Sequence, residues 1–159
     1  MSSTSTAIRL SSYQKLDFGD FKDYIVDDSV FLNSIITRAI QDTELVIYAL
    51  AMHKQVDTAD EALTLEAIYI YGHVQTRVFI DFPEDAIVTP EEIRSYSKSS
   101  VNYSAEATAL LSKFVNFYIF SVLQAAAKQA SEAGTTTITQ EHFFSWCHHL
   151  PYPLNVYLC

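Results

Sequence analysis

The residues best suited to chemistry gather near the C-terminus. His142, Cys147, His148 and His149 fall within one short stretch, and Cys159 ends the sequence. Histidine nitrogen and cysteine sulfur are preferred zinc ligands, and a structural site uses four of them. A zinc site of His142, His149, Cys159 and a fourth ligand is therefore one alternative. We prefer the other, an aromatic packing helix with polar histidines at its edge and neither metal nor cofactor.

Other chemistry-bearing residues have simpler explanations. Cys147 lies near histidines, but no third orienting residue or oxyanion motif accompanies it, so we reject a nucleophile. Asp57, Asp60 and Glu61 stand where acids stabilise the start of a helix. The sequence contains no Gly-rich phosphate loop and no HExxH motif. We therefore predict a protein that is not an enzyme.

Charge and composition narrow the class of partner. The formal net charge is −9, and residues 1–88 hold fourteen of the nineteen acids but only six of the ten basic residues. Without a basic patch, tight binding of nucleic acid by this chain alone is disfavoured. Two cysteines make no disulfide framework, and no apolar run reaches the length of a membrane span. We expect a soluble intracellular protein.

The element that positions most of the apolar residues is one long helix over residues 104–134. Apolar residues recur three and four apart, Ser104 is a good N-cap, and Gly134 suits the position just past the helix end. Such a helix would be roughly 45 Å long. From 114 to 123 only Asn116 and Ser121 are polar.

A helix that is apolar nearly all round must be covered nearly all round. Its short neighbours supply too little cover, so we predict a partner chain on this face. The predicted interface consists of Leu110, Leu111, Phe114, Phe117, Tyr118, Phe120, Val122 and Leu123.

The whole chain is predicted to consist of three parts. Residues 1–12 are Ser/Thr-rich and are expected to form a disordered tail. Residues 13–88 are expected to form an acidic helical extension, with helices over 29–54 and from a capping box at Thr58–Glu61 to about Ile80. Residues 89–159 are expected to hold short, long and short helices and an apolar tail, with starts at Thr89, Ser104 and Thr139. The fold class is all-α.

The order of helices from Thr89 to Leu150 resembles the histone fold. It is carried by Glu92-Ile93-Arg94-Ser95-Tyr96, by Ser104-Ala105-Glu106-Ala107 and by Thr136-Thr137-Ile138-Thr139. The first helix looks like the TBP-associated factors of transcription initiation. The end, Glu141-His142 with Leu150-Pro151, is similar to centromere protein X.

The resemblance implies a heterodimer in which the long helices of two chains cross antiparallel. It also implies a nuclear transcription-initiation or coactivator complex, or alternatively a centromere or DNA-repair complex. A self-contained helical adaptor, with the N-terminal helices covering the long one, is a further alternative. Three alternatives stay open for residues 13–88: an extra helical layer on the histone fold, a binding surface for a larger complex, or a second, degenerate histone fold.

This chain departs from typical histone folds at two places that bear on DNA binding. Many histone folds pair a base before the Thr run with Asp in the last helix, whereas this chain has Gly134, Thr135 and His142 there. The loops 99–103 and 135–139 contain no Lys or Arg. Any contact with DNA is therefore expected only through a dimer.

Overall fold

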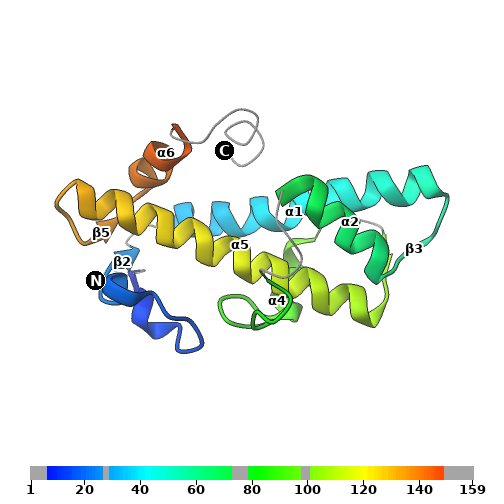
Figure 1. Cartoon of the computed structure of the whole chain (residues 1–159), viewed down its shortest axis with the longest axis horizontal. Helices are drawn as coiled ribbons and strands as arrows, with labels where there is room; N and C mark the ends of the chain where they lie inside the picture. The colour runs from blue at the N-terminus through cyan, green and yellow to red at the C-terminus, as the bar shows by residue number, and fades with distance from the viewer. Residues whose placement is uncertain (1–6, 27–28, 73–78, 98–100, 149–159) are drawn as a thin grey trace, which may run out of the picture. The chain divides into compact units, whose positions relative to one another are not determined.

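The computed structural model describes residues 7–26, 29–72, 79–97 and 101–148 and is mostly helical (Figure 1). It divides into two compact units. Unit 1 combines Met1–Ile35 with Phe120–Cys159, and unit 2 is Ile36–Ile119. Two long helices, α1 (Ser29–Lys54) and α5 (Ala105–Glu132), each contribute residues to both units.

Both long helices were predicted, and their bounds follow from local signals. Ser104 Oγ accepts the backbone N–H of Ala107 at 3.1 Å, which caps the start of α5. Gly134 follows the end of α5 with φ +80°, a conformation that glycine adopts without strain. In α1, the buried Thr43 hydroxyl donates to the Ala39 carbonyl at 2.7 Å, so the helix continues through this polar position.

Unit 2 contains most of α1, then β3 (Thr58–Ala59), α2 (Glu61–Gly72), α4 (Pro90–Tyr96), β4 (Asn102–Tyr103) and the first half of α5. Strands β3 and β4 pair in parallel, with Thr58 opposite Asn102. The predicted capping box at Thr89 and Glu92 is confirmed, and Pro90 opens α4.

Helix α2 differs from the prediction at its start. Asp60, and not Thr58, accepts the backbone N–H of Leu63 at 2.9 Å, because Thr58 is drawn into a strand. The described helix runs to Gly72, and residues 73–78, over which it was expected to continue to about Ile80, lie outside the described part of the chain.

Unit 1 contains β1 (Ile8–Arg9), η1 (Leu10–Ser12), η2 (Gly19–Phe21), β2 (Ile25–Val26), the first turns of α1, the second half of α5, β5 (Thr137–Ile138) and α6 (Gln140–His148). Strand β2 lies between β1 and β5, antiparallel to the first and parallel to the second. The extended segment and the helix expected after Gly134 are confirmed as β5 and α6.

A disordered tail was expected over residues 1–12, and this expectation is wrong for residues 7–12. Residues 7–12 are built into the fold, because Leu10 is fully buried and its N–H donates to the Tyr24 carbonyl at 2.9 Å. The N–H of Ser11 likewise donates to the Lys22 carbonyl at 2.7 Å. Residues 1–6 lie outside the described part.

In each unit, a strand next to α1 pairs in parallel with a strand next to α5. In unit 1, the strand before α1 pairs with the strand after α5. In unit 2, the strand after α1 pairs with the strand before α5. The N-terminal residues, expected to form an extension, therefore supply one partner of each parallel pair.

Candidate interaction face on the long helix

The eight predicted interface residues lie on α5 and are largely covered within the chain. Six of them are buried, with at most 7% of each exposed: Leu110, Leu111, Phe114, Tyr118, Val122 and Leu123. The two that motivated the prediction, Phe117 and Phe120, are intermediate in exposure. The question is therefore what covers these two rings.

In unit 1, the N-terminal segment covers Phe120. The ring of Phe18 lies 4.9 Å from the ring of Phe120, centroid to centroid, at an interplanar angle of 51°. Phe18 is itself only 3% exposed. Sequence reasoning left residues 13–28 open between an ordered lead-in and a segment that docks on a partner, and the described residues 13–26 are an ordered part of the fold.

In unit 2, the segment after α2 covers Phe117. Phe79 is fully buried, 5.6 Å from the ring of Phe114 and 6.3 Å from that of Phe117. Phe82 meets Phe117 edge-on at 5.6 Å. Tilted and edge-to-face rings at these distances are the arrangements that aromatic pairs favour. Part of the cover that we assigned to a partner chain thus comes, at these positions, from this chain, and both rings keep intermediate exposure.

A residue that sequence reasoning passed over fastens this segment to α5. Asn116 is fully buried, and its Oδ1 accepts the backbone N–H groups of Ile87 at 2.7 Å and Val88 at 2.9 Å. Its Nδ2 donates to the carbonyls of Glu84, Val88 and Ser112 at 2.8–3.0 Å. The sequence did hold a signal for this role, a single amide side chain within an apolar stretch. A buried amide needs a donor for its oxygen and acceptors for its nitrogen.

Two phenols from different helices meet beside this face in unit 2. The rings of Tyr71 on α2 and Tyr118 on α5 are 6.1 Å apart. Burial raises the pKa of Tyr71 above its ordinary value, and the neighbouring Tyr118 and Asp42 add to the effect. Burial likewise raises the pKa of Tyr118. Both hydroxyls therefore stay neutral across the physiological range and act as packing groups.

On α1, Asp42 faces Arg38, with Oδ2 3.7 Å from Nε. Burial raises the pKa of Asp42, and the Arg38 guanidinium opposes this shift. The pair is about two-fifths exposed on each side, so its contribution to stability is small.

The last helix uses its first histidine for capping. His142 Nδ1 accepts the backbone N–H of Thr139 at 3.0 Å, the reciprocal bond that Glu makes in a capping box. His149 and Cys159, the other named candidates for zinc, lie outside the described residues, and so do the side chains of Cys147 and His148. In the described part of the chain, no three His, Cys, Asp or Glu residues gather in a way that could hold a metal ion.

Helix α5 also meets the length and composition of a membrane span. Sequence reasoning found no such run. Of its most apolar 18-residue window, 61% is buried inside the structure, as in the core helix of a soluble protein, which passes the same test.

Unit 2 exposes apolar side chains on another helix. Leu45, Tyr48 and Met52 recur three and four apart on α1 and are 66%, 42% and 59% exposed. This spacing places them along one face of the helix. Tyr69 and Ile70 on α2 are exposed as well. An exposed apolar helix face is typical of a surface that binds another protein.

Comparisons with known proteins do not assign the chain to a group. Its sequence matches no model of a known protein family, and no curated protein matches it.

Proposed function

We propose that the chain is a non-catalytic histone-fold subunit of a nuclear transcription-initiation or coactivator complex, and that it carries both members of the histone pair. In this proposal α1 and α5 are the two long helices. Each is followed by a short strand and a short helix, β3 with α2 in the first case and β5 with α6 in the second.

The observation that supports the proposal best is the reciprocal pairing of strands. When two long helices cross antiparallel, the loop before each helix must lie beside the loop after the other. The pairs Ile25 with Thr137 and Thr58 with Asn102 are those two neighbours. The second, degenerate histone fold that the sequence left open would then be residues 7–72, with η2 in place of a regular first helix.

Charge favours protein partners over direct binding of DNA. The net charge is −9, and strands β4 and β5 contain no Lys or Arg with which to meet phosphates. The exposed face of Leu45, Tyr48 and Met52 offers an apolar surface to another protein. We therefore expect the complex to be held together by protein contacts, with DNA reached only through other subunits.

An engineered disulfide between β3 and β4 tests whether the pair forms within one chain. Neighbouring strands lie about 4.8 Å apart, within the range a disulfide spans. Thr58→Cys and Asn102→Cys, in a chain with Cys147→Ser and Cys159→Ser, should cross-link within monomers of 18.0 kDa on oxidation. Each single-cysteine variant is the matched control, because it can only cross-link between molecules.

A disulfide found only between chains, or a chain that is monodisperse only with a histone-fold partner, would contradict the internal pair. It would support the heterodimer instead. Affinity purification from nuclear extract then identifies the complex. Transcription-initiation subunits support the proposal, whereas centromere or DNA-repair subunits support the alternative resemblance.

A further inference from the structure

The exposed face of helix α1 in unit 2 consists of apolar side chains. Leu45, Tyr48 and Met52 form this face, because they recur three and four residues apart. Val56, just past the end of the helix, is 43% exposed, and its N–H donates to the Ala51 carbonyl at 3.0 Å, which holds it against the last turn. At about 1.5 Å per residue, a partner segment of roughly three turns would cover the face.

The two cations that flank this face already have partners. Between Arg38 and Lys54, helix α1 contains no Lys or Arg. Arg38 pairs with Asp42, with 3.7 Å between Nε and Oδ2. Lys54 pairs with Glu66 of α2, with 2.9 Å between Nζ and Oε2. The face itself therefore offers no positive charge to a partner.

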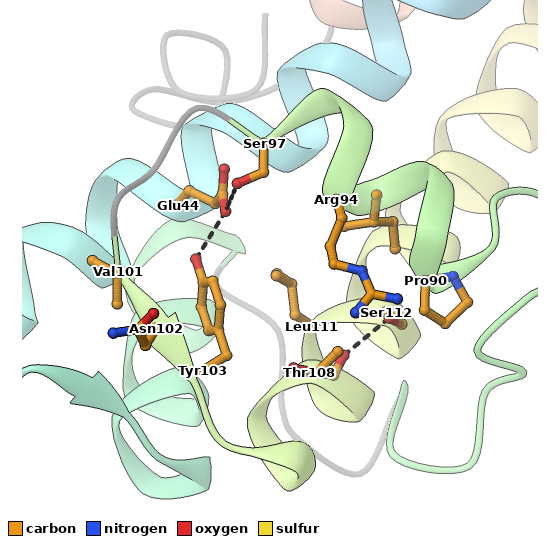
Figure 2. A pocket seen from close by; sticks show the side chains of 11 residues that line it. Glu44, Pro90, Arg94, Ser97, Val101, Asn102, Tyr103, Thr108, Leu111 and Ser112 are labelled. Atoms are coloured by element: carbon orange, nitrogen blue, oxygen red, sulfur yellow. Dashed lines mark hydrogen bonds between the residues drawn. The ribbon is translucent and has the colours of Figure 1, made fainter.

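The acid nearest to the face in sequence, Glu44, is turned into the fold. It is only 3% exposed, and its Oε2 accepts hydrogen bonds from the hydroxyls of Ser97 at 2.6 Å and Tyr103 at 2.9 Å. Figure 2 shows both donors reaching this carboxylate from the end of α4 and from β4. Glu44 thus belongs to the interior of unit 2 and not to the exposed face.

Exposed carboxylates lie just beyond the C-terminal end of the face. They are Asp57, Asp60, Glu61 and Glu106. The first three follow α1 directly, and the fourth is in the first turn of α5, which the pairing of β3 with β4 brings to the same end of unit 2 (Figure 1). Residues 55–65 and 101–112 contain no Lys or Arg. These acids and the C-terminal end of the α1 dipole favour a cation here.

This distribution of charge separates the classes of partner. Residues 36–119, which form unit 2, contain twelve Asp or Glu and six Lys or Arg. A second copy of the chain would bring like charges together. Nucleic acid and an anionic lipid surface would be repelled in the same way. A partner that is apolar along one side and basic at one end complements both the face and the acids beside it.

The partner segment is expected to be helical. The backbone groups of α1 are bonded within the helix, so a partner cannot add a strand to it as it could to the edge of a sheet. The partner must therefore satisfy its own backbone groups, as a helix does. A helix with apolar residues three and four apart also matches the spacing of the side chains on α1.

We propose that the exposed face of α1 binds an amphipathic helix of a partner protein, with the partner's apolar stripe on this face and its Lys or Arg residues beside the carboxylates that follow α1. Such a partner is a specific case of the protein contact in the proposed function, on which this inference rests. The histone pair has its own test in the engineered disulfide, so each of the two can fail alone.

Methyl NMR with the full chain tests the proposal. The sequence contains two methionines, Met1 and Met52, so carbon-13 labelling of methionine methyl groups gives two signals, and Met52→Leu identifies the one on the face. The probe is a synthetic peptide of about eighteen residues, with leucines three and four apart and three lysines at one end. A second peptide has glutamate in place of lysine, and a third has glutamine in place of leucine.

The lysine peptide should shift the Met52 signal with a Kd below 1 mM. The glutamate peptide should bind at least tenfold more weakly, because its charges meet acids. The glutamine peptide should cause no shift at 1 mM, because it has no apolar stripe.

A variant of the apolar face shows whether this surface is responsible. Leu45→Asp places a charge on the face without disturbing the interior, so the affinity for the lysine peptide should fall at least tenfold. Val30→Asp is the matched control, since it makes a similar change at a residue of the same helix that is 76% exposed and lies in unit 1. It should leave the affinity within twofold.

A second pair of variants tests the acids. Asp57→Asn with Glu61→Gln should weaken binding of the lysine peptide at least threefold at low salt, and the difference should shrink at high salt. Asp20→Asn with Glu132→Gln removes the same two charges from exposed positions of unit 1 and should leave the affinity within twofold.

The proposal is wrong if the lysine peptide leaves the Met52 signal unchanged at 1 mM, or if the glutamate peptide binds equally well. It is equally wrong if Leu45→Asp folds and binds the lysine peptide as the wild type does. If Leu45→Asp does not fold, Tyr48→Gln, which removes a ring without adding charge, decides by the same criterion. A Met52 signal that moves with the concentration of the chain alone, together with a dimer on sizing, would assign the face to a second copy and would also overturn the proposal.

Discussion

Asn116 offers the sharpest test of how the cover over α5 is held. Replacing it by alanine removes five hydrogen bonds at once: two accepted from backbone N–H groups and three donated to carbonyls. Four of these five bonds join α5 to residues 84–88. The variant leaves the aromatic contacts of Phe79 and Phe82 in place, so it separates hydrogen bonding from packing.

The magnitude follows from which groups lose their partners. Val88 is 2% exposed, so its N–H would be buried without an acceptor, at a cost of about 1–3 kcal/mol. The Ile87 N–H, the Glu84 carbonyl and the Val88 carbonyl each lose a bond that contributes about 0.5–1.5 kcal/mol net. The Ser112 carbonyl keeps its ordinary helical bond. The free energy of unfolding should therefore fall by roughly 3–7 kcal/mol.

Urea denaturation followed by circular dichroism measures the change. For a slope of about 2 kcal/mol per molar urea, the midpoint should fall by roughly 1.5–3.5 M. Lys113→Ala, three residues earlier on the same helix and only partly buried, is the matched control and should change stability by less than about 0.5 kcal/mol. Asn116→Asp should be at least as damaging as alanine at neutral pH, because a carboxylate would then face three carbonyls. A loss below about 1 kcal/mol in Asn116→Ala would refute the reasoning, since it would mean that water replaces these bonds freely.

Three further outcomes are expected. Because the folded state raises the pKa values of Tyr71 and Tyr118, stability should be complete below pH about 10, the ordinary pKa of the unfolded phenol, and should fall above it. Tyr118→Phe should flatten this fall in pH-dependent denaturation, and the exposed Tyr69→Phe should not; equal slopes would contradict the assignment. Alanine variants of Phe18 and Phe120, made singly and together, should reveal a coupling of about 0.5–1.5 kcal/mol in the free energy of unfolding, and strict additivity would show that the two rings do not interact. The isolated chain should bind duplex DNA weakly and without sequence preference in salt-titrated anisotropy, since its net charge is −9; tight binding at physiological salt would overturn the charge argument.

Helix boundaries were readable in the sequence because their causes are local. Each cap links residues three apart, as between Thr89 and Glu92 and between Ser104 and Ala107. The turn after α5 depends on one residue, Gly134, that adopts a positive φ at no steric cost. The two long helices and the strand-like run before the last helix were therefore predicted close to their observed bounds. The second helix was not, because Thr58 is held by a strand partner 44 positions away and not by its neighbours.

The segments that cover α5 could not be predicted from local sequence, because they are far in sequence from the residues that they contact. Phe18 and Phe120, or Asn116 and residues 84–88, become neighbours only when separate segments pack. The all-round apolar helix indicated that Phe117 and Phe120 need cover, and both rings are partly covered. Periodicity carries no information on whether a ring is covered by its own chain or another. The same holds for Glu44. In the sequence, an acid within a helix suggests a solvated side chain. Only the approach of Ser97 and Tyr103 makes Glu44 a buried carboxylate, whose Oε1 has no hydrogen-bond partner among the described residues.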